Sequence, residues 1–326
     1  MKRIAVLTSG GDAPGMNAAI RAVVRYGISE DLEVFGIERG YAGLIDNVFI
    51  PMNMRTVSDI VQRGGTLLRT ARSEEFMTAQ GQEIAVKFLN KRGIDGVIVI
   101  GGDGSFRGAE ALSKHGVPTI GIPGTIDNDL AYTDFTLGFD TACNTVLDAI
   151  NKLRDTMSSH DRICIIEVMG RKCGDIALHA GIGGGAEIVL VPEVPTTYME
   201  ILERLNKDRN KGKFSSIIVI AEGVGKAEEL RLKIKESLGA SVRATVLGHL
   251  QRGGSPSARD RYLGTCWGVQ AVKLLKEHKG NRVVGIKDNR FFDMEIDKAM
   301  KIKKQFDYEL YDMANVVSNS AISFRH

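Results

Sequence analysis

Cysteine, proline and tryptophan are all scarce in this chain of 326 residues, which contains four, seven and one of them. The cysteines are Cys143, Cys164, Cys173 and Cys266, and no two of them form a C-x-x-C pair. Common zinc sites and disulfide frameworks rely on characteristic cysteine spacings, so we expect neither. We predict reduced thiols that are buried as small apolar side chains.

The chain also lacks an excess of charge and a long apolar run. Lysine and arginine number 43, aspartate and glutamate 40, and the net charge is +3. This balance gives no reason to expect a nucleic acid or a membrane surface as a partner. Apolar runs such as residues 97–100 and 217–221 are far shorter than the roughly 20 residues that span a bilayer. Residues 4–7 are too short for a signal peptide core, so we expect a cytoplasmic protein.

Glycine, in contrast, is abundant: 37 residues, or about 11% of the chain against a typical ~7%. Many glycines follow short apolar runs, which occupy residues 4–7, 97–100, 119–122, 163–166, 188–191 and 217–220. Such runs are typical of buried parallel strands. Residues 17–29 and 141–155 are predicted helices, the first with Asn17 as its N-cap. The sequence thus predicts two α/β lobes with glycines at strand ends, where ligands of open sheets bind.

Two glycine-rich loops carry an acidic residue after a predicted strand. Gly101 to Ser105 reads GGDGS, in which the glycines let backbone amides approach a polyphosphate and Asp103 is suited to Mg²⁺. A tight turn alone would explain the glycines but not the aspartate, so we favour a nucleotide site. Ser9 to Gly15 reads SGGDAPG with glycines at Walker spacing, but Met16 stands where a P-loop needs lysine. It predicts phosphate contact at a helix start.

A third loop, Pro123 to Asp129, reads PGTIDND. Asp127 and Asp129 repel each other unless cations or donors lie between them. Asp127 is suited to accept a proton from an attacking hydroxyl, and Thr125 to donate to a transferred phosphoryl group. An Asx-turn loop whose acids bind only backbone amides explains the same residues. Alone, this loop does not decide between the two interpretations.

Several arginines stand in loops or at strand ends, where they could neutralise phosphate: Arg72, Arg162, Arg171, Arg243 and Arg252. Each alone is more simply an exposed surface residue, but five in such contexts favour phosphate binding. Arg21 and Arg25 lie four residues apart on a predicted helix and repel each other unless an anion joins them. An exposed helix face explains this pair as well.

Five segments together resemble the bacterial ATP-dependent 6-phosphofructokinase family (type A). They are TSGGDAPGMNAA (8–19), GGDGS (101–105), PGTIDND (123–129), VMGRKCG (168–174) and VLGHLQRGGSP (246–256). The resemblance implies transfer of the ATP γ-phosphoryl group to the 1-hydroxyl of fructose 6-phosphate with Mg²⁺, the committed step of glycolysis. It also implies a homotetramer whose subunits have two similar three-layer α/β/α lobes with largely parallel sheets and an active site in the cleft between them.

The resemblance also assigns parts of the chain to lobes and roles. The larger, ATP-binding lobe is expected to comprise residues 1–138 and 251–300, and the smaller, fructose 6-phosphate lobe residues 139–250 and 301–326. Asp127 is the implied general base, with Thr125, Asp129 and Arg171 as catalytic partners, and Asp103 is the metal ligand. Implied ATP contacts are Gly11, Tyr41, Arg72, Ser73, Gly102, Asp103, Gly104, Ser105 and Gly108. Implied fructose 6-phosphate contacts are Thr125, Asp127, Asp129, Arg162, Met169, Gly170, Arg171, Glu222, Arg243, His249 and Arg252, with Arg162 and Arg243 supplied by a neighbouring subunit.

Further implications concern the phosphoryl donor and regulation. Pyrophosphate-dependent relatives typically carry aspartate at the position of Gly104 and lysine at that of Gly124, so these two glycines favour ATP. An effector site at which ADP activates and phosphoenolpyruvate inhibits is matched by Arg21, Arg25, Arg154, Gly185, Glu187, Lys211 and Lys213. The chain departs from common family residues at Met54, Lys211 and Ser215 in that site, and at Ser73-Glu74.

We therefore expect an ATP-dependent 6-phosphofructokinase. The alternatives are a pyrophosphate-dependent phosphofructokinase and a catalytically silent sensor of nucleotides or sugar phosphates. A lipid or NAD kinase would explain GGDG, but not PGTIDND or GHLQRGG.

Overall fold

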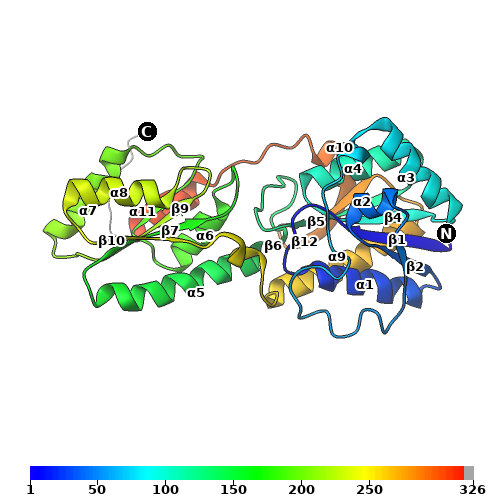
Figure 1. Cartoon of the computed structure of the whole chain (residues 1–326), viewed down its shortest axis with the longest axis horizontal. Helices are drawn as coiled ribbons and strands as arrows, with labels where there is room; N and C mark the ends of the chain where they lie inside the picture. Colours follow the sequence, from blue (N-terminus) through cyan, green and yellow to red (C-terminus); the bar gives the residue numbers. More distant parts are fainter. Residues whose placement is uncertain (319–326) are drawn as a thin grey trace. The chain divides into compact units, whose positions relative to one another are not determined.

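The structure, a computed structural model, describes residues 1–318, so the end of the predicted smaller lobe, residues 319–326, lies outside the described residues. The chain forms two compact units (Figure 1). Unit 1 comprises residues 1–126, 130–141 and 252–304, and unit 2 comprises residues 127–129, 142–251 and the segment from 305 onward. Each unit is thus assembled from segments that are distant in sequence.

Unit 1 is built on an eight-stranded sheet. Its strands are β1 (Arg3–Thr8), β2 (Glu33–Ile37), β3 (Phe49–Met52), β4 (Gly96–Gly101), β5 (Thr119–Thr125), β6 (Leu137–Gly138), β11 (Arg282–Lys287) and β12 (Arg290–Glu295). Their order is β12-β11-β5-β4-β1-β2-β3, with β6 paired to the end of β5. Among these described strands only β3 and β12 run antiparallel to their neighbours. The predicted α/β class with a largely parallel sheet is confirmed.

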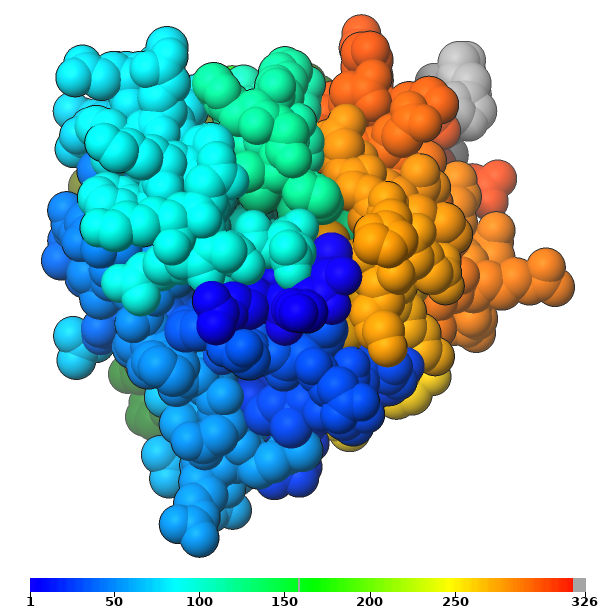
Figure 2. Space-filling model, turned by 90° about the vertical axis from the view of Figure 1, so that its right-hand side faces the viewer, coloured from blue at the N-terminus to red at the C-terminus, as the bar shows by residue number. Residues whose placement is uncertain are grey.

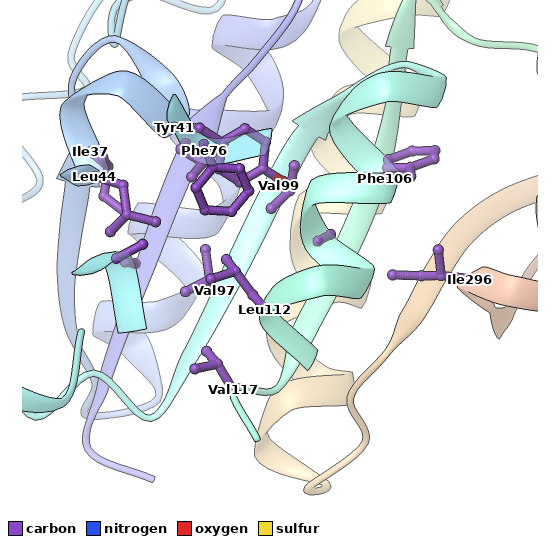
Figure 3. Close-up of a cluster of buried hydrophobic side chains, with 14 of the residues drawn as sticks. Ile37, Tyr41, Leu44, Phe76, Val97, Val99, Phe106, Leu112, Val117 and Ile296 are labelled. Atoms are coloured by element: carbon purple, nitrogen blue, oxygen red, sulfur yellow. The ribbon is translucent and has the colours of Figure 1, made fainter. Parts of the chain in front are cut away.

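Helices cover both faces of this sheet (Figure 1). One face carries α1 (Met16–Ser29) and α9 (Ala258–Lys276), and the other carries α2 (Gly40–Ile45), α3 (Ala79–Lys91) and α4 (Asp103–Lys114), with the short helices η1 (Glu75–Met77) and α10 (Ile296–Ala299). Val97 and Val99 of β4 pack with Phe106 and Leu112 of α4 (Figure 3). The alternate residue Ile98 is also fully buried. Because both faces are covered, the strands are continuously apolar.

The start of the chain is held at the surface of unit 1 between later segments (Figure 2). The Arg3 amide donates to the Asp95 carboxylate at 3.0 Å, and the Arg3 guanidinium donates to the Arg92 carbonyl at 3.1 Å. These contacts anchor β1, which is a central strand. The loop that follows β1 therefore begins from a fixed point.

Unit 2 is built on four parallel strands in the order β10-β7-β9-β8. The strands are β7 (Ile163–Val168), β8 (Ile188–Leu190), β9 (Ser216–Ala221) and β10 (Val242–Val246), and the helices are α5 (Phe139–Ser158), α6 (Asp175–Gly183), α7 (Tyr198–Asn210), α8 (Ala227–Leu238) and α11 (Tyr308–Val317), with the short η2 (Gly248–Arg252). Ile201 of α7 and Ile234 of α8 pack on Ile165 and Ile218 of the sheet. Helix α5 begins in unit 1 and continues into unit 2.

The predicted strands and helices are present, but two details of the prediction are wrong. Asn17 does not cap α1, because the N-cap is Gly15, whose φ is +100°. The Asn17 side chain instead donates to the carbonyls of Arg63 and Gly64 and accepts from the Leu67 amide, so it holds a distant loop. Cys266 is only half-buried, whereas the other three cysteines are buried. No helix within residues 1–318 is long and apolar enough to cross a membrane.

Candidate functional site

The carboxyl ends of β1, β4 and β5 lie next to one another in unit 1. Strand β4 pairs with β1 on one side and β5 on the other, and all three are parallel. The Ser9 amide donates to the Ile100 carbonyl at 3.0 Å, which ties the first loop to β4. The three predicted loops, residues 9–15, 101–105 and 123–129, therefore leave the sheet at the same end.

Neighbouring side chains lie very close to two of the predicted ATP-binding glycines, the flexible Arg252 guanidinium at one and the buried Tyr41 ring at the other. A Cβ on Gly11 would lie 2.2 Å from Nη1 of Arg252, whose guanidinium donates to the Asp12 carbonyl at 3.2 Å. A Cβ on Gly108 would lie 2.5 Å from the ring of Tyr41. Gly104 differs, because its Cβ position has no protein atom within 4 Å. Open space therefore adjoins the first turn of α4.

The first turn of α4 also carries Asp103 and Ser105. The Asp103 carboxylate, which is 43% exposed, pairs with Arg107 one turn later, with Oδ2 and Nη2 3.1 Å apart. The buried Tyr41 hydroxyl donates to the Ser105 carbonyl at 2.6 Å, and its ring stacks on Phe76 with 4.2 Å between centroids. Burial raises the pKa of Tyr41 well above its ordinary value, so this hydroxyl stays a donor. Tyr41 thus fixes the backbone of α4, and its contact with ATP stays a prediction.

Two further predicted ATP residues precede η1. Arg72 is exposed, and the Ser73 hydroxyl accepts from the Phe76 amide at 3.2 Å. The hydroxyl therefore fixes the start of η1, on which Tyr41 stacks. Contact of Arg72 and Ser73 with ATP stays a prediction.

The predicted base in unit 2 is buried and paired with a cation. The Arg171 Nε lies 3.2 Å from the Asp127 Oδ2, and Asp127 is fully buried. The Arg171 amide donates to the Glu222 carboxylate at 2.8 Å. Between Asp127 and Asp129, the Asn128 side chain donates to the Asp175 carboxylate at 2.9 Å. Three segments that are distant in sequence thus meet, and the ion pair favours the catalytic interpretation of the loop over an Asx turn.

The predicted fructose 6-phosphate residues of unit 2 divide between the two ends of its sheet. Met169, Gly170 and Glu222 follow β7 and β9, at the carboxyl end. Arg162 precedes β7, and Arg243 is paired in register with Cys164 near the amino end. The six residues of β7 separate the two ends by about 20 Å. On one chain, therefore, Arg162 and Arg243 do not lie beside Met169.

The other two predicted fructose 6-phosphate residues outside the acidic loop are in different units. His249 is an exposed residue of η2 in unit 2. Arg252 belongs to unit 1, where it contacts the glycine-rich loop after β1 as described above. The buried Gln251 between them accepts from the Met169 amide at 3.2 Å and so fixes the end of β7 in unit 2.

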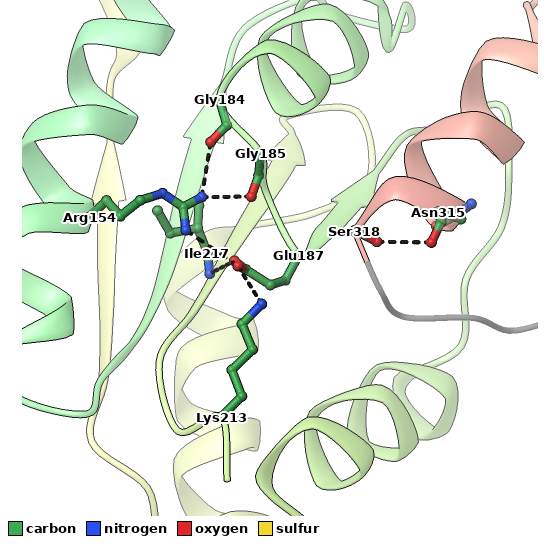
Figure 4. Close-up of polar contacts among 8 residues, drawn as sticks. All are labelled: Arg154, Gly184, Gly185, Glu187, Lys213, Ile217, Asn315 and Ser318. Carbon is green, nitrogen blue, oxygen red and sulfur yellow. Dashed lines mark hydrogen bonds and ion pairs between the residues drawn. The ribbon is translucent and has the colours of Figure 1, made fainter. Parts of the chain in front are cut away.

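Three predicted effector residues form an ion-pair cluster in unit 2 (Figure 4). The buried Oε1 of Glu187 lies 3.4 Å from Nη1 of Arg154 and 2.8 Å from Nζ of Lys213. The other oxygen, Oε2, accepts from the Ile217 amide at 2.6 Å. Arg154 also donates to the Gly185 carbonyl at 2.6 Å. The cluster thus presents two cations around one buried carboxylate.

A cavity of about 180 Å³ opens beside this cluster, and Ala314 and Val317 of α11 form part of its lining. Lys211 is exposed. Arg21 and Arg25 lie on α1 in unit 1, apart in sequence from the cluster. Their participation in one effector site stays a prediction.

Sequence reasoning did not single out several residues that shape these sites. They are Phe76, Arg107, Asp175, Gln251 and Asp260. Arg107 carried a local signal, since it follows Asp103 by one helical turn. Asp260 carried a signal only for the start of its own helix, as the fourth residue of a Ser-x-x-Asp pattern. It carried none for Thr141 and Gly138, which it binds across 119 and 122 residues of sequence.

Asp103 can hold a divalent metal that arrives with a phosphate ligand. No group of three or more His, Cys, Asp or Glu residues that could hold a metal occurs in residues 1–318. Mg²⁺ typically takes only one or two carboxylates together with phosphate oxygens and waters. A half-exposed carboxylate beside the open space at Gly104 suits that kind of binding.

A parallel sheet with glycine-rich loops at its carboxyl end, a carboxylate at a helix N-terminus and a buried aspartate paired with arginine defines an α/β protein built for phosphate ligands and phosphoryl transfer. The family model described as phosphofructokinase matches residues 3–275. The chain belongs to the phosphofructokinase family.

Individual relatives agree with this assignment. A curated relative from Clostridium novyi, named ATP-dependent 6-phosphofructokinase, is 61% identical over 318 residues, which cover 98% of this chain and 100% of the relative. The solved phosphofructokinase of Saccharomyces cerevisiae is 35% identical with a TM-score of 0.86, over 98% of this chain and 47% of that chain. The solved pyrophosphate-dependent phosphofructokinase of Marinobacter aquaeolei is 22% identical with a TM-score of 0.85, over 95% and 86% of the two chains. This last likeness concerns the fold alone, so the fold does not distinguish the two phosphoryl donors.

Proposed function

We propose that this chain transfers the γ-phosphoryl group of ATP to the 1-hydroxyl of fructose 6-phosphate, with Mg²⁺, and releases ADP and fructose 1,6-bisphosphate. The observation that carries the proposal is the fully buried Asp127 carboxylate 3.2 Å from the Arg171 guanidinium, just after a strand end in a chain of the phosphofructokinase family. Phosphoryl transfer needs such a base and such a cation side by side. The high identity to an ATP-dependent 6-phosphofructokinase supports ATP as donor.

In this proposal Asp127 accepts the proton of the 1-hydroxyl while the hydroxyl oxygen attacks. Arg171 and Thr125 stabilise the charge that spreads over the oxygens of the transferred group. The Glu222 carboxylate holds the Arg171 backbone, which orients the guanidinium. Asp103 would hold Mg²⁺, which would supply positive charge to the phosphate oxygens. Asp129, Met169, Gly170, His249 and Arg252 orient the sugar phosphate.

We assign ATP to unit 1, whereas the proposed fructose 6-phosphate contacts belong to unit 2 apart from Thr125 and Arg252. The ATP contacts are Gly11, Tyr41, Arg72, Ser73, Gly102, Asp103, Gly104, Ser105 and Gly108. The open space beside Gly104 supports this assignment, because a nucleotide needs room next to the phosphates that pyrophosphate does not.

Regulation and assembly form a second part of the proposal. ADP and phosphoenolpyruvate act at the cluster of Arg154, Glu187 and Lys213, and the enzyme is a homotetramer. The cluster has two cations and one carboxylate, a net positive charge that favours an anion, and the cavity beside it offers space. Titration with phosphoenolpyruvate should raise the fructose 6-phosphate concentration needed for half-maximal rate. An unchanged saturation curve would mean that this cluster is no regulatory site.

A donor exchange tests the main proposal. Fructose 6-phosphate and Mg²⁺ are offered with either ATP or pyrophosphate, and formation of fructose 1,6-bisphosphate is measured. We expect turnover with ATP and none with pyrophosphate, and we expect Asp127→Asn to lower kcat by about 10²- to 10⁴-fold. Asp161→Asn, at an exposed acid of unit 2, is the matched control and should leave kcat unchanged.

Each alternative function gives a different result. Turnover with pyrophosphate in place of ATP would identify a pyrophosphate-dependent enzyme. Equal rates for the unaltered chain and Asp127→Asn, with ATP and sugar phosphate still bound, would identify a silent sensor.

A further inference from the structure

Asp260 is a fully buried carboxylate in the first turn of α9, and it binds a segment far from it in sequence. Its Oδ1 accepts from the Gly138 amide at 2.9 Å. Its Oδ2 accepts from the Thr141 amide at 2.9 Å and from the Thr141 hydroxyl. Both oxygens therefore accept from the segment from Gly138 to Thr141, which contains the start of α5, and Oδ2 also lies 3.5 Å from the Ser257 hydroxyl.

This segment is paired with the end of β5. In the parallel pairing of β5 with β6, Gly124 lies opposite Leu137 and Thr125 lies opposite Gly138. The Thr136 hydroxyl donates to the Thr125 carbonyl at 2.6 Å. Asp260 thus binds β6, and β6 is paired with Thr125 of β5. Thr125 lies two residues before Asp127.

Gly138 is closely packed in this arrangement. Its φ is +96°, which favours glycine. A Cβ there would lie 2.8 Å from the Ala13 Cβ, 3.0 Å from the Ile126 Cγ2 and 3.0 Å from the Pro14 Cδ. Gly138 is therefore packed against both the loop after β1 and the residue that precedes Asp127. A shift of Gly138 would therefore disturb its packing against both segments.

An ionised carboxylate is energetically unfavourable at this buried position. Burial raises the pKa of Asp260 from 3.8 to about 6, although hydrogen bonds from Thr141 and Gly138 lower it, and the nearby Asp140 of α5 raises it further. The group is therefore charged at neutral pH in a place that disfavours charge. The helix is already capped by Ser257, whose hydroxyl accepts from the Asp260 amide at 3.2 Å, so the charge of the Asp260 side chain points to a role beyond capping.

We propose that Asp260 is a positioning residue for phosphoryl transfer. Through Gly138 and Thr141 it fixes β6 and the start of α5, and through β6 it sets the backbone of Thr125 and Ile126 ahead of Asp127. This inference rests on the proposed function, since it concerns the base and the phosphoryl-binding threonine of that reaction. Asp260 itself touches no substrate in this role.

The test compares Asp260→Asn with Thr141→Ser. Asparagine keeps the shape of the side chain and one acceptor for Gly138, but its amide group cannot accept from Thr141. Asp260→Asn should lower kcat by about tenfold to a hundredfold, because small misplacements of reacting groups are costly, while KM for both substrates changes less than threefold. Thr141→Ser keeps both donors to Asp260 and should retain kcat within about twofold.

Hydrogen exchange gives a readout that does not depend on activity. In Asp260→Asn the amides of residues 124–141 should exchange faster, with the rest of unit 1 unchanged. If the unaltered chain turns over ATP and Asp260→Asn has the same kcat, the inference is wrong, whatever the loss in stability. If the unaltered chain turns over neither donor, the proposed function is wrong instead, and faster exchange would then report only a structural role.

Discussion

Gly104 and Gly124, the two glycines linked to the phosphoryl donor by the family resemblance, differ in their surroundings. A Cβ on Gly124 would lie 3.0 Å from the Met16 Cε and 3.2 Å from the Ile100 Cγ2, so a side chain there fits only if these neighbours shift by a few tenths of an ångström. Gly104 has no protein atom within 4 Å of its Cβ position. Of the two, therefore, Gly104 is the position at which a side chain can be added without moving a neighbour.

Gly104→Asp should weaken ATP binding without unfolding the chain. The open space accepts the side chain, but the new carboxylate repels the phosphates of ATP. We expect KM for ATP to rise by at least about tenfold, equivalent to ~1.4 kcal/mol, with an unchanged Tm. Gly104→Ala is the matched control, since it fills the space without charge and should stabilise α4 by about 0.5–1 kcal/mol. An unchanged KM in Gly104→Asp would show that ATP does not occupy this space.

Arg107 pairs with Asp103 and should compete with a metal for that carboxylate. Exposed ion pairs contribute about 0.2–1 kcal/mol, so Arg107→Gln should tighten metal binding by only about 1.5- to 5-fold. Mn²⁺ titration in the presence of ATP, followed by electron paramagnetic resonance, measures this directly. Lys152→Gln removes an equivalent pair with Asp148 in α5 and should have no effect. Weaker Mn²⁺ binding in Arg107→Gln would contradict the competition.

At the scale of helices and strands, the sequence predicted the parallel strands, whose residues are buried on both faces of the sheet. Continuous apolar runs located the parallel strands because helices cover both sides of each sheet. The sequence did not indicate why helices also contain glycine. A Cβ on Gly268 of α9 would lie 2.7 Å from the Ala19 carbonyl of α1, so this glycine allows two helices to approach closely. Part of the glycine excess therefore serves packing rather than phosphate.

The contacts within the candidate site were less predictable. The segments were recognisable from the family resemblance, but the sequence could not show that Arg171 pairs with Asp127 or that Tyr41 is buried under Phe76. Such contacts depend on tertiary packing between segments that are distant in the chain. Asp260 is the extreme case, because neither its own helix nor its neighbours in sequence indicate that it binds Gly138 and Thr141.

The pairing of α9 with the start of α5 through Asp260 should make stability depend on pH. The folded-state pKa is raised from 3.8 to about 6, so the unfolded chain releases this proton first. The stability that Asp260 contributes is therefore full below pH 3.8 and is lost as the pH rises to about 6. The asparagine side chain of Asp260→Asn does not titrate. As the pH rises over that range, the unfolding free energy of the variant minus that of the unaltered chain should therefore increase, by on the order of 3 kcal/mol at most.

Urea unfolding of both chains at pH 4, 5, 6 and 7 measures this difference, because other titrating groups are common to both. A difference that stays constant from pH 4 to pH 7 would show that the carboxyl pKa is not raised in the folded chain.

At the scale of the whole molecule, the division of the unit 2 sheet bears on assembly. Arg162 and Arg243 lie near its amino end, and Met169 and Glu222 at its carboxyl end. One sugar phosphate cannot contact both ends of a strand about 20 Å long. If all four residues bind fructose 6-phosphate, two subunits must share each site, and a subunit alone is incomplete.

Complementation between inactive subunits tests this shared site. Asp127→Asn should lack the base, and Arg243→Ser should lack the 6-phosphate contact. In a pair of one subunit of each kind, one site carries both changes and the other carries neither. Random co-assembly in equal amounts after co-expression should therefore restore about a quarter of the normal activity. Arg162→Ser mixed with Arg243→Ser is the control, because both changes affect the same side of the shared site and no intact site forms. Recovery in neither mixture would show that each subunit binds its sugar phosphate alone.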